Sequence, residues 1–196
     1  MPSKLVRCWN TTNSLYIKYH DEEWGVAVHD DEKLFELLTL EGFQAGLTWE
    51  LILKRRDALK KAFSGFRPKI IAHFTAADVE EILKNSNVIR NKAKIAATVN
   101  NAQRLIEIPR EFGSFDKFIW QFVDGKPLDN ALKTMSEMPA ETDESRAMSK
   151  ELKKRGFKFV GPVICYAFMQ AVGMVNDHLT FCFRYKQIKE SNAHLP

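Results

Sequence analysis

Apolar side chains recur along this chain at intervals of three and four residues, which is the spacing of an amphipathic helix. The clearest example follows the acidic residues 30–32 and runs through Leu34, Leu37 and Leu38 to Glu41. Similar stripes lie at 51–63, at Ile89, Ala93, Ala96, Val99, Ala102 and Ile106, and at Phe115, Phe118, Ile119 and Phe122. No segment alternates apolar and polar residues between hairpin-turn dipeptides. The pattern therefore predicts an all-α fold.

Residues that cap helix N-termini stand where several of these stripes begin. Thr48 and Ser114 each precede an apolar stripe, and Thr75 with Asp78 has the spacing of a capping box. The stretch 124–142 contains two prolines and scattered charges, so it is expected to be an extended connection.

The composition narrows the class of protein. The chain has 196 residues, of which 45% are hydrophobic and 28% charged, which is typical of a soluble globular protein and excludes a disordered or fibrous one. The longest apolar stretch, 160–175, is interrupted by Pro162 and Gln170 and is too short to span a membrane. The first residues lack the apolar core of a signal peptide, so a cytoplasmic protein is expected. Without an internal repeat or long linker, residues 1–196 should form a single functional unit.

The net charge of +4 conceals an uneven distribution. Residues 1–50 carry a net charge of −5 and residues 51–100 one of +7, while 101–150 carry −2 and 151–196 carry +4. Two basic blocks suit a polyanionic partner such as nucleic acid, but they are also typical of solvated helix faces. Charge alone does not decide between these interpretations.

Residues 152–162 predict a helix, a tight turn and a second helix. Gly156 suits the left-handed position that ends a helix, and Pro162 suits the first turn of the next one. Backbone N–H groups near Gly161 would lie at a helix N-terminus, close to Lys158 and the basic residues 153–155, where an anion is stabilised. The segment could bind a DNA phosphate, or it could be a helical corner with a basic rim. Its second helix contains no lysine, so it offers no amine nucleophile for a strand-cleaving lyase reaction.

Aromatic residues are concentrated near the N-terminus. Three of the four tryptophans (Trp9, Trp24 and Trp49) and two tyrosines (Tyr16 and Tyr19) fall within the first quarter of the chain. Aromatic faces can stack on an extruded base, although core packing is the more common role of any one such residue.

Glu41 shares its apolar stripe with three leucines, where a carboxylate is costly unless it has a partner. It could accept hydrogen bonds from a base and stabilise positive charge, or it could pair with an arginine or a helix end.

The three cysteines form an odd set, which argues against a disulfide framework. His178 and Cys182 are four residues apart and would share one face of a helix, and Cys8 and His20 could supply two more ligands. A Cys₂His₂ set suits a closed, structural zinc site that would join the two ends of the chain. Cys165 lies in an apolar run and is expected to be a core residue.

Four segments together resemble the DNA-3-methyladenine glycosylase I (Tag) family of helix-hairpin-helix glycosylases. They are LYIKYHDEEWG (15–25), LEGFQAGLTW (40–49), KKRGFKFVG (153–161) and VNDH (175–178) with Cys182.

The resemblance implies a role for each candidate residue. Glu41 would recognise and stabilise the base in a pocket formed by Tyr16, Tyr19 and Trp49, with Trp9 and Trp24 beside it. Cys8, His20, His178 and Cys182 would bind one structural zinc. A helix-hairpin-helix over about 145–173, with Gly156, Lys158 and Gly161, would hold the DNA backbone, and Leu47 would act as a wedge in the duplex.

The activity implied is hydrolysis of the N-glycosidic bond of 3-methyladenine in double-stranded DNA, without lyase activity. A monomer that needs no protein partner and no membrane is expected. Asp177 is expected to start a helix or to support a ligand. Two alternatives remain: a zinc-containing DNA-binding module without chemistry, and a glycosylase that accepts other alkylpurines.

Overall fold

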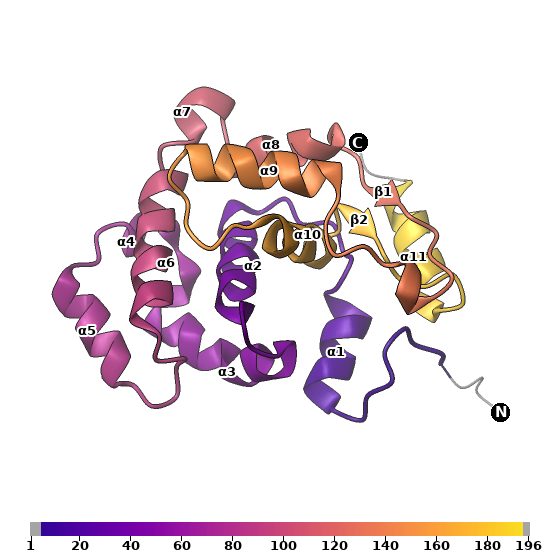
Figure 1. The fold of residues 1–196 in the computed structure, drawn as a ribbon, viewed down its shortest axis with the longest axis horizontal. Helices are drawn as coiled ribbons and strands as arrows, with labels where there is room; N and C mark the ends of the chain where they lie inside the picture. The colour runs from indigo at the N-terminus through magenta and orange to yellow at the C-terminus, as the bar shows by residue number, and fades with distance from the viewer. Residues whose placement is uncertain (1–4, 194–196) are drawn as a thin grey trace.

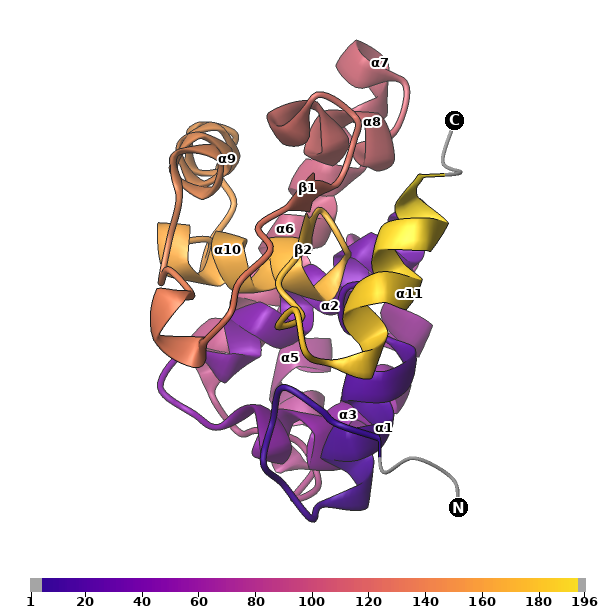
Figure 2. The ribbon, with the colours of Figure 1, turned by 90° about the vertical axis from the view of Figure 1, so that its right-hand side faces the viewer.

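The computed structural model describes residues 5–193 as a helical protein with one very small sheet (Figures 1 and 2). The α-helices are α1 (Ser14–Glu22), α2 (Asp31–Gln44), α3 (Trp49–Ala62), α4 (Pro68–Ile71), α5 (Ala76–Lys84), α6 (Lys92–Leu105), α7 (Pro109–Phe112), α8 (Phe115–Trp120), α9 (Asp143–Lys154), α10 (Pro162–Ala171) and α11 (Phe183–Asn192). The 3₁₀ helices are η1 (Ser64–Phe66), η2 (Gln121–Val123) and η3 (Met135–Glu137). Within residues 5–193, no helix is both long and apolar enough to cross a bilayer.

The helix starts follow the capping residues seen in the sequence. The Thr48 side chain accepts a hydrogen bond from the Leu51 N–H at the start of α3, and Ser114 caps α8 in the same way. Thr75 and Asp78 form the capping box of α5. These predictions are confirmed, because each depends only on residues adjacent in the chain.

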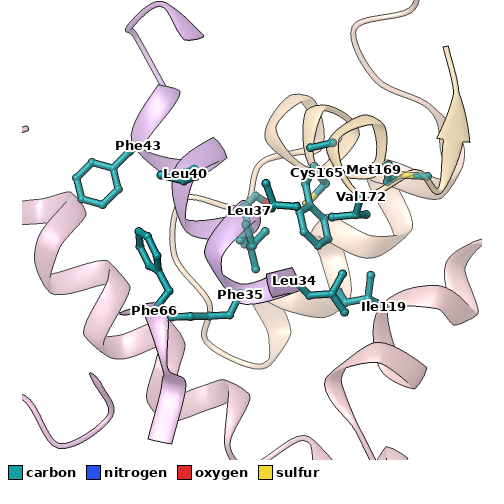
Figure 3. Packing of buried hydrophobic residues seen from close by; sticks show 14 of the residues in the cluster. Leu34, Phe35, Leu37, Leu40, Phe43, Phe66, Ile119, Cys165, Met169 and Val172 are labelled. Carbon is teal, nitrogen blue, oxygen red and sulfur yellow. The ribbon is translucent and has the colours of Figure 1, made fainter. Parts of the chain in front are cut away.

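Helix α2 lies at the centre of the molecule, with α3, α6 and α10 around it (Figure 1). Every residue from Leu34 to Phe43 is buried, so α2 is enclosed on all sides instead of carrying one apolar stripe. Figure 3 shows Leu37 directed toward Val172 near the end of α10, and Leu34 beside Ile119 of α8. Glu41 is therefore buried by the helix as a whole.

Helix α6 differs from the predicted stripe. Ile89 precedes the helix, which Asn91 caps, and Ala93 and Ala96 are exposed. The buried face instead includes Lys94 and Thr98, alongside the apolar Ile95, Val99, Ala102 and Leu105. Alanine is too small to mark a buried face, and buried polar residues carry no signal in a hydrophobic pattern.

The all-α prediction is correct except for one short parallel pair of strands. β1 (Leu128–Asp129) lies in the predicted extended connection and pairs with β2 (Val175–Asn176), with Leu128 opposite Val175. Two residues per strand are too few to produce a recognisable alternation.

Helices α9 and α10 are joined by a tight turn. Gly156 has a φ of +86°, which is the left-handed conformation expected of it. Beyond α10, Gly173 meets the segment 25–28: a Cβ at this position would lie 2.5 Å from the Ala27 nitrogen. The end of α10 thereby holds the link between α1 and α2.

Candidate functional site

A cavity of about 150 Å³ lies among α1, α2, α3, α10 and the connection that follows β1. It is lined by Trp9, Tyr16, Tyr19, Trp24, Glu41, Gln44, Trp49, Met138, Ala167 and Gln170. All six residues predicted from the sequence to recognise a base are in this set. Helices α1, α2 and α3 and the loops beside α1 contribute these six residues, and α10 closes the cavity with Ala167 and Gln170.

The carboxylate of Glu41 is buried, and no residue between 5 and 193 places a cation beside it. Among these described residues, its Oε2 atom has no hydrogen-bond partner, and neither has the Nε1 atom of Trp49 in the same cavity. Burial raises the pKa of Glu41 to about 8, because the charged form loses its hydration. An unsatisfied buried carboxylate is costly, so its place beside a cavity points to a ligand.

The aromatic rings form the walls around this carboxylate. Trp9 stacks on Tyr16 with ring centroids 4.8 Å apart, and the ring of Trp24 lies 4.6 Å from that of Trp9. Tyr19 and Trp49 form a second pair at 5.2 Å. Flat aromatic walls with one buried acceptor suit a planar, cationic ring that carries N–H donors.

Four lining residues were missed by the sequence reasoning. Gln44 lies one helical turn beyond Glu41 and could have been found from that spacing. Met138, Ala167 and Gln170 lie on other elements and gave no local signal.

Asp177 supports the cavity wall from behind and does not begin a helix. It is buried after β2, and its carboxylate accepts hydrogen bonds from Gln170 Nε2 (2.8 Å), the Tyr166 hydroxyl (2.7 Å) and Asn130 Nδ2 (2.7 Å). The helix-start alternative is therefore wrong.

Cys8, His20, His178 and Cys182 meet in a second buried cluster. Their ligand atoms all lie within 4.8 Å of one another. His178 Nδ1 is 3.6 Å from Cys8 Sγ and 3.7 Å from Cys182 Sγ, and His20 Nε2 is 3.6 Å from Cys182 Sγ. A tetrahedral zinc site with ordinary bond lengths places sulfur and nitrogen ligands about 3.6 Å apart. The residues thus fit a structural metal ion.

In both histidines, the ring nitrogen that points away from the sulfur atoms donates a hydrogen bond. His20 Nδ1 donates to Asp21 (2.8 Å), which Arg7 binds in turn (2.7 Å), and His178 Nε2 donates to the Trp24 carbonyl (3.0 Å). These bonds direct His20 Nε2 and His178 Nδ1 toward the sulfurs, as in metal sites.

His178 and Cys182 were expected to share one face of a helix, and this prediction is wrong. They lie in a turn before α11, in which the Cys182 N–H donates to the Leu179 carbonyl, and not on one helix face. A turn reverses the chain and brings the two side chains together as well as a helix would.

The residues expected to contact DNA lie on two exposed turns. Leu47 is partly exposed between α2 and α3, after Gly46 with a φ of +75°. Lys158 is exposed on the α9–α10 turn, and the space beside Gly161 is open. Arg155 does not face this space, because it pairs with Glu111 and stacks on two phenylalanines.

Known proteins resemble this chain over nearly its full length. The sequence profile described as methyladenine glycosylase matches residues 9–185. The chain is 47% identical over 177 residues to a DNA-3-methyladenine glycosylase of Haemophilus influenzae, covering 90% of this chain and 96% of that protein. It is 46% identical over 182 residues to DNA-3-methyladenine glycosylase 1 of Escherichia coli, covering 92% and 97%.

Solved structures agree with the sequence comparisons. A crystal structure of a 3-methyladenine DNA glycosylase I matches with a TM-score of 0.88 at 47% identity, covering 91% of this chain and 98% of that one. The enzyme from Staphylococcus aureus, described for its recognition of 3-methyladenine, matches with a TM-score of 0.88 at 39% identity, covering 90% and 94%. The profile match includes every residue that lines the cavity. This chain belongs to the methyladenine glycosylase family.

Proposed function

We propose that this protein hydrolyses the N-glycosidic bond of 3-methyladenine in alkylated double-stranded DNA, releasing the free base and leaving an abasic site. The main observation behind this proposal is the carboxylate of Glu41, which is buried in a cavity with aromatic walls and whose Oε2 atom has no hydrogen-bond partner among the described residues. Relatives named DNA-3-methyladenine glycosylase support the substrate, as does the structure of such an enzyme in complex with 3-methyladenine.

The chemistry needs little acid–base help. Methylation at N3 makes the attached adenine a cation, so the bond pair between the sugar carbon and the base nitrogen leaves with the base and neutralises it. The sugar carbon is then positively charged and takes up water, which loses a proton. The Glu41 carboxylate accepts hydrogen bonds from the base and stabilises positive charge, while Trp49 and Tyr19 hold the ring by stacking.

The reaction is proposed to stop at the abasic site. A lyase step requires an amine that attacks the sugar carbon and forms a Schiff base. None of the described residues that line the cavity is a lysine, and α10 contains none.

We further infer how the DNA is held. The α9–α10 turn would bind a backbone phosphate as a helix-hairpin-helix over about 145–173, through N–H groups near Gly156 and Gly161 and through Lys158. Leu47 would occupy the space left by the extruded nucleotide. Residues 1–196 would act as one monomeric unit in the cytoplasm.

We also propose that Cys8, His20, His178 and Cys182 hold one zinc ion. Four protein ligands leave no open position, so the ion would stabilise the fold and take no part in the reaction. The matching ligand distances and the hydrogen-bonded outer nitrogens support this proposal.

One incubation tests the function. DNA treated with a methylating agent is mixed with the protein, and the released bases are separated and quantified. Release of 3-methyladenine, with strand breaks only after alkali, is the expected result. Release of 7-methylguanine in similar amounts would indicate a broader glycosylase, and no release at all would leave a DNA-binding module.

A further inference from the structure

Helix α6 carries a buried polar face that the catalytic proposal does not use. Lys94, Thr98 and Asn101 are spaced by four and three residues, so they share one side of the helix, and all three are buried. This side faces α2 and the loop between α9 and α10, which passes between α2 and α6 in Figure 1. Buried polar groups of this kind need partners, and their partners reveal what the helix holds.

Lys94 binds the end of α2. Its Nζ donates to the Phe43 carbonyl (2.7 Å) and to the Ala45 carbonyl (2.6 Å). The last turn of α2 has no basic residue of its own, so Lys94 supplies the positive charge that a helix C-terminus favours. These carbonyls belong to residues 43–48, here named the wedge turn, which ends α2 and presents Leu47.

Asn101 binds the loop on the other side. Its Nδ2 donates to the Lys158 carbonyl (2.9 Å), and its Oδ1 accepts from the Lys158 N–H (2.8 Å). Asn100 adds a bond from its Nδ2 to the Gly156 carbonyl (2.8 Å). Residues 156–161, here named the hairpin loop, are thus attached to α6 through three hydrogen bonds.

The hairpin loop needs such support. Phe159 follows Lys158 with a φ of +55°, a conformation that an aromatic residue adopts only when its surroundings impose it. The two hydrogen bonds between Asn101 and the Lys158 backbone fix the residue that precedes Phe159. The loop also packs closely on α2, since a Cβ at Gly42 would lie 3.4 Å from that of Phe159.

We propose that α6 is a brace that fixes the wedge turn and the hairpin loop relative to each other, with Lys94 and Asn101 as its positioning residues. The inference rests on the proposed function, in which the first loop opens the duplex and the second holds its backbone. Seven residues of helix separate the two attachments, a rise of about 10 Å that a rigid helix keeps constant. Binding of the backbone would then place Leu47 at the damaged nucleotide.

The test is a double-mutant cycle between loops. Lys94→Met removes both bonds to the wedge turn, and Leu47→Ala removes the wedge itself. Thr98→Val is the matched control, because Thr98 is buried on the same face but its hydroxyl donates only to the Lys94 carbonyl of its own helix. Single-turnover release of 3-methyladenine from duplex DNA, affinity for free 3-methyladenine, and amide hydrogen exchange in residues 43–48 are measured.

Lys94→Met should slow release from duplex DNA by about 10-fold or more and speed exchange in the wedge turn, with affinity for the free base unchanged. The slowing should shrink to about twofold in the Leu47→Ala background, because Lys94 is proposed to act by positioning Leu47. If the two residues acted independently, Lys94→Met would slow release equally in both backgrounds. Thr98→Val should behave as wild type. Equal slowing in both backgrounds, or a weaker affinity for the free base, overturns the brace.

A second variant covers the case in which Lys94→Met does not fold. Asn101→Leu removes the two hydrogen bonds from α6 to Lys158 in the hairpin loop. Its effect on release should also be non-additive with that of Leu47→Ala, although Asn101 and Leu47 lie on separate elements. Additive effects overturn the brace while leaving the glycosylase proposal intact. Failure of the wild type to release 3-methyladenine is a different result and overturns both.

Discussion

Two buried polar clusters lie side by side in this protein, and they differ in how their atoms are satisfied. In the cavity, Glu41 Oε2 and Trp49 Nε1 have no hydrogen-bond partner in the part of the chain that the structure describes. In the Cys-His cluster, each histidine has one nitrogen bound to Asp21 or to the Trp24 carbonyl and the other directed at a sulfur. Helix α1 contributes to both, since Tyr19 lines the cavity and His20 joins the cluster.

The difference fits the two ligands proposed, a transient substrate in the cavity and a permanent ion in the Cys-His cluster. Atoms left unsatisfied raise the energy of the free protein and lower it again when a substrate binds, so they suit turnover. Outer hydrogen bonds that fix every ligand atom suit an ion that remains for the life of the protein. The predictions below test this contrast.

The largest effect is expected from loss of the cluster. His178→Ala should abolish metal binding and remove most of the folded protein, because a structural zinc site contributes on the order of 10 kcal/mol to folding. Wild-type protein should contain about one zinc per chain. Metal analysis and circular dichroism provide the measurements.

Cys165→Ala is the matched control for this variant. Cys165 is buried in α10 but lies outside the cluster, so its replacement should lower stability and keep the zinc. Wild-type protein purified without any metal would refute the assignment.

The next effect concerns the reaction. Glu41→Gln keeps the size of the side chain but cannot carry a negative charge beside the cationic base, so it should slow release of 3-methyladenine by on the order of 10²-fold. Single-turnover assays with saturating enzyme measure this step without product release. An unchanged rate would remove Glu41 from the catalytic role.

The same substitution should stabilise the folded protein. Burial raises the pKa of Glu41 from 4.5 to about 8, so between these pH values the folded state holds a proton that the unfolded state has lost. Stability conferred by this site therefore falls as the pH rises through that window and is constant above it. Glu41→Gln should gain on the order of 2 kcal/mol over the wild type at pH 7 and nothing below pH 4.

Glu36→Gln provides the contrast within the same helix. Glu36 is also buried in α2, but it pairs with Arg56 (2.7 Å) and Lys33 (3.1 Å). Its replacement should destabilise the protein, because Arg56 loses a buried partner. Thermal denaturation of both variants and of the wild type between pH 4 and pH 9 measures the change in stability that each substitution causes. Destabilisation by both would mean that Glu41 is satisfied in the free protein.

The smallest effect is expected at the hairpin loop. Lys158→Gln should weaken DNA binding several-fold for all sequences and reduce the slope of log K against log salt by about 1. Lys84→Gln on α5 removes the same charge far from the hairpin and should change neither quantity by as much. A loss confined to particular sequences would contradict a backbone contact.

The elements of the fold that could be predicted are those decided by neighbours in the chain. The caps at Thr48 and Thr75 and the turn at Gly156 depend on residues within four positions. The enclosure of α2 and the burial of Lys94 depend on helices that are distant in sequence, and no local pattern reports them.

The candidate site divides in the same way. Glu41 and four of the aromatic residues could be identified because they fall in two short segments that resemble the Tag family. Gln170 and Met138 could not, because an ordinary residue becomes part of a cavity only when another element places it there. The backing of Gln170 by Asp177 is likewise a tertiary contact.

The Cys-His cluster also has a consequence for synthesis. Cys8 and His178 are 170 residues apart, so the N-terminal ligands wait for nearly the whole chain to leave the ribosome. Trp9, which lines the cavity, is the neighbour of Cys8 and packs against His20. A chain interrupted before Cys182 therefore cannot complete the cluster or anchor that wall of the cavity. Unfinished copies should therefore lack the proposed glycosylase activity.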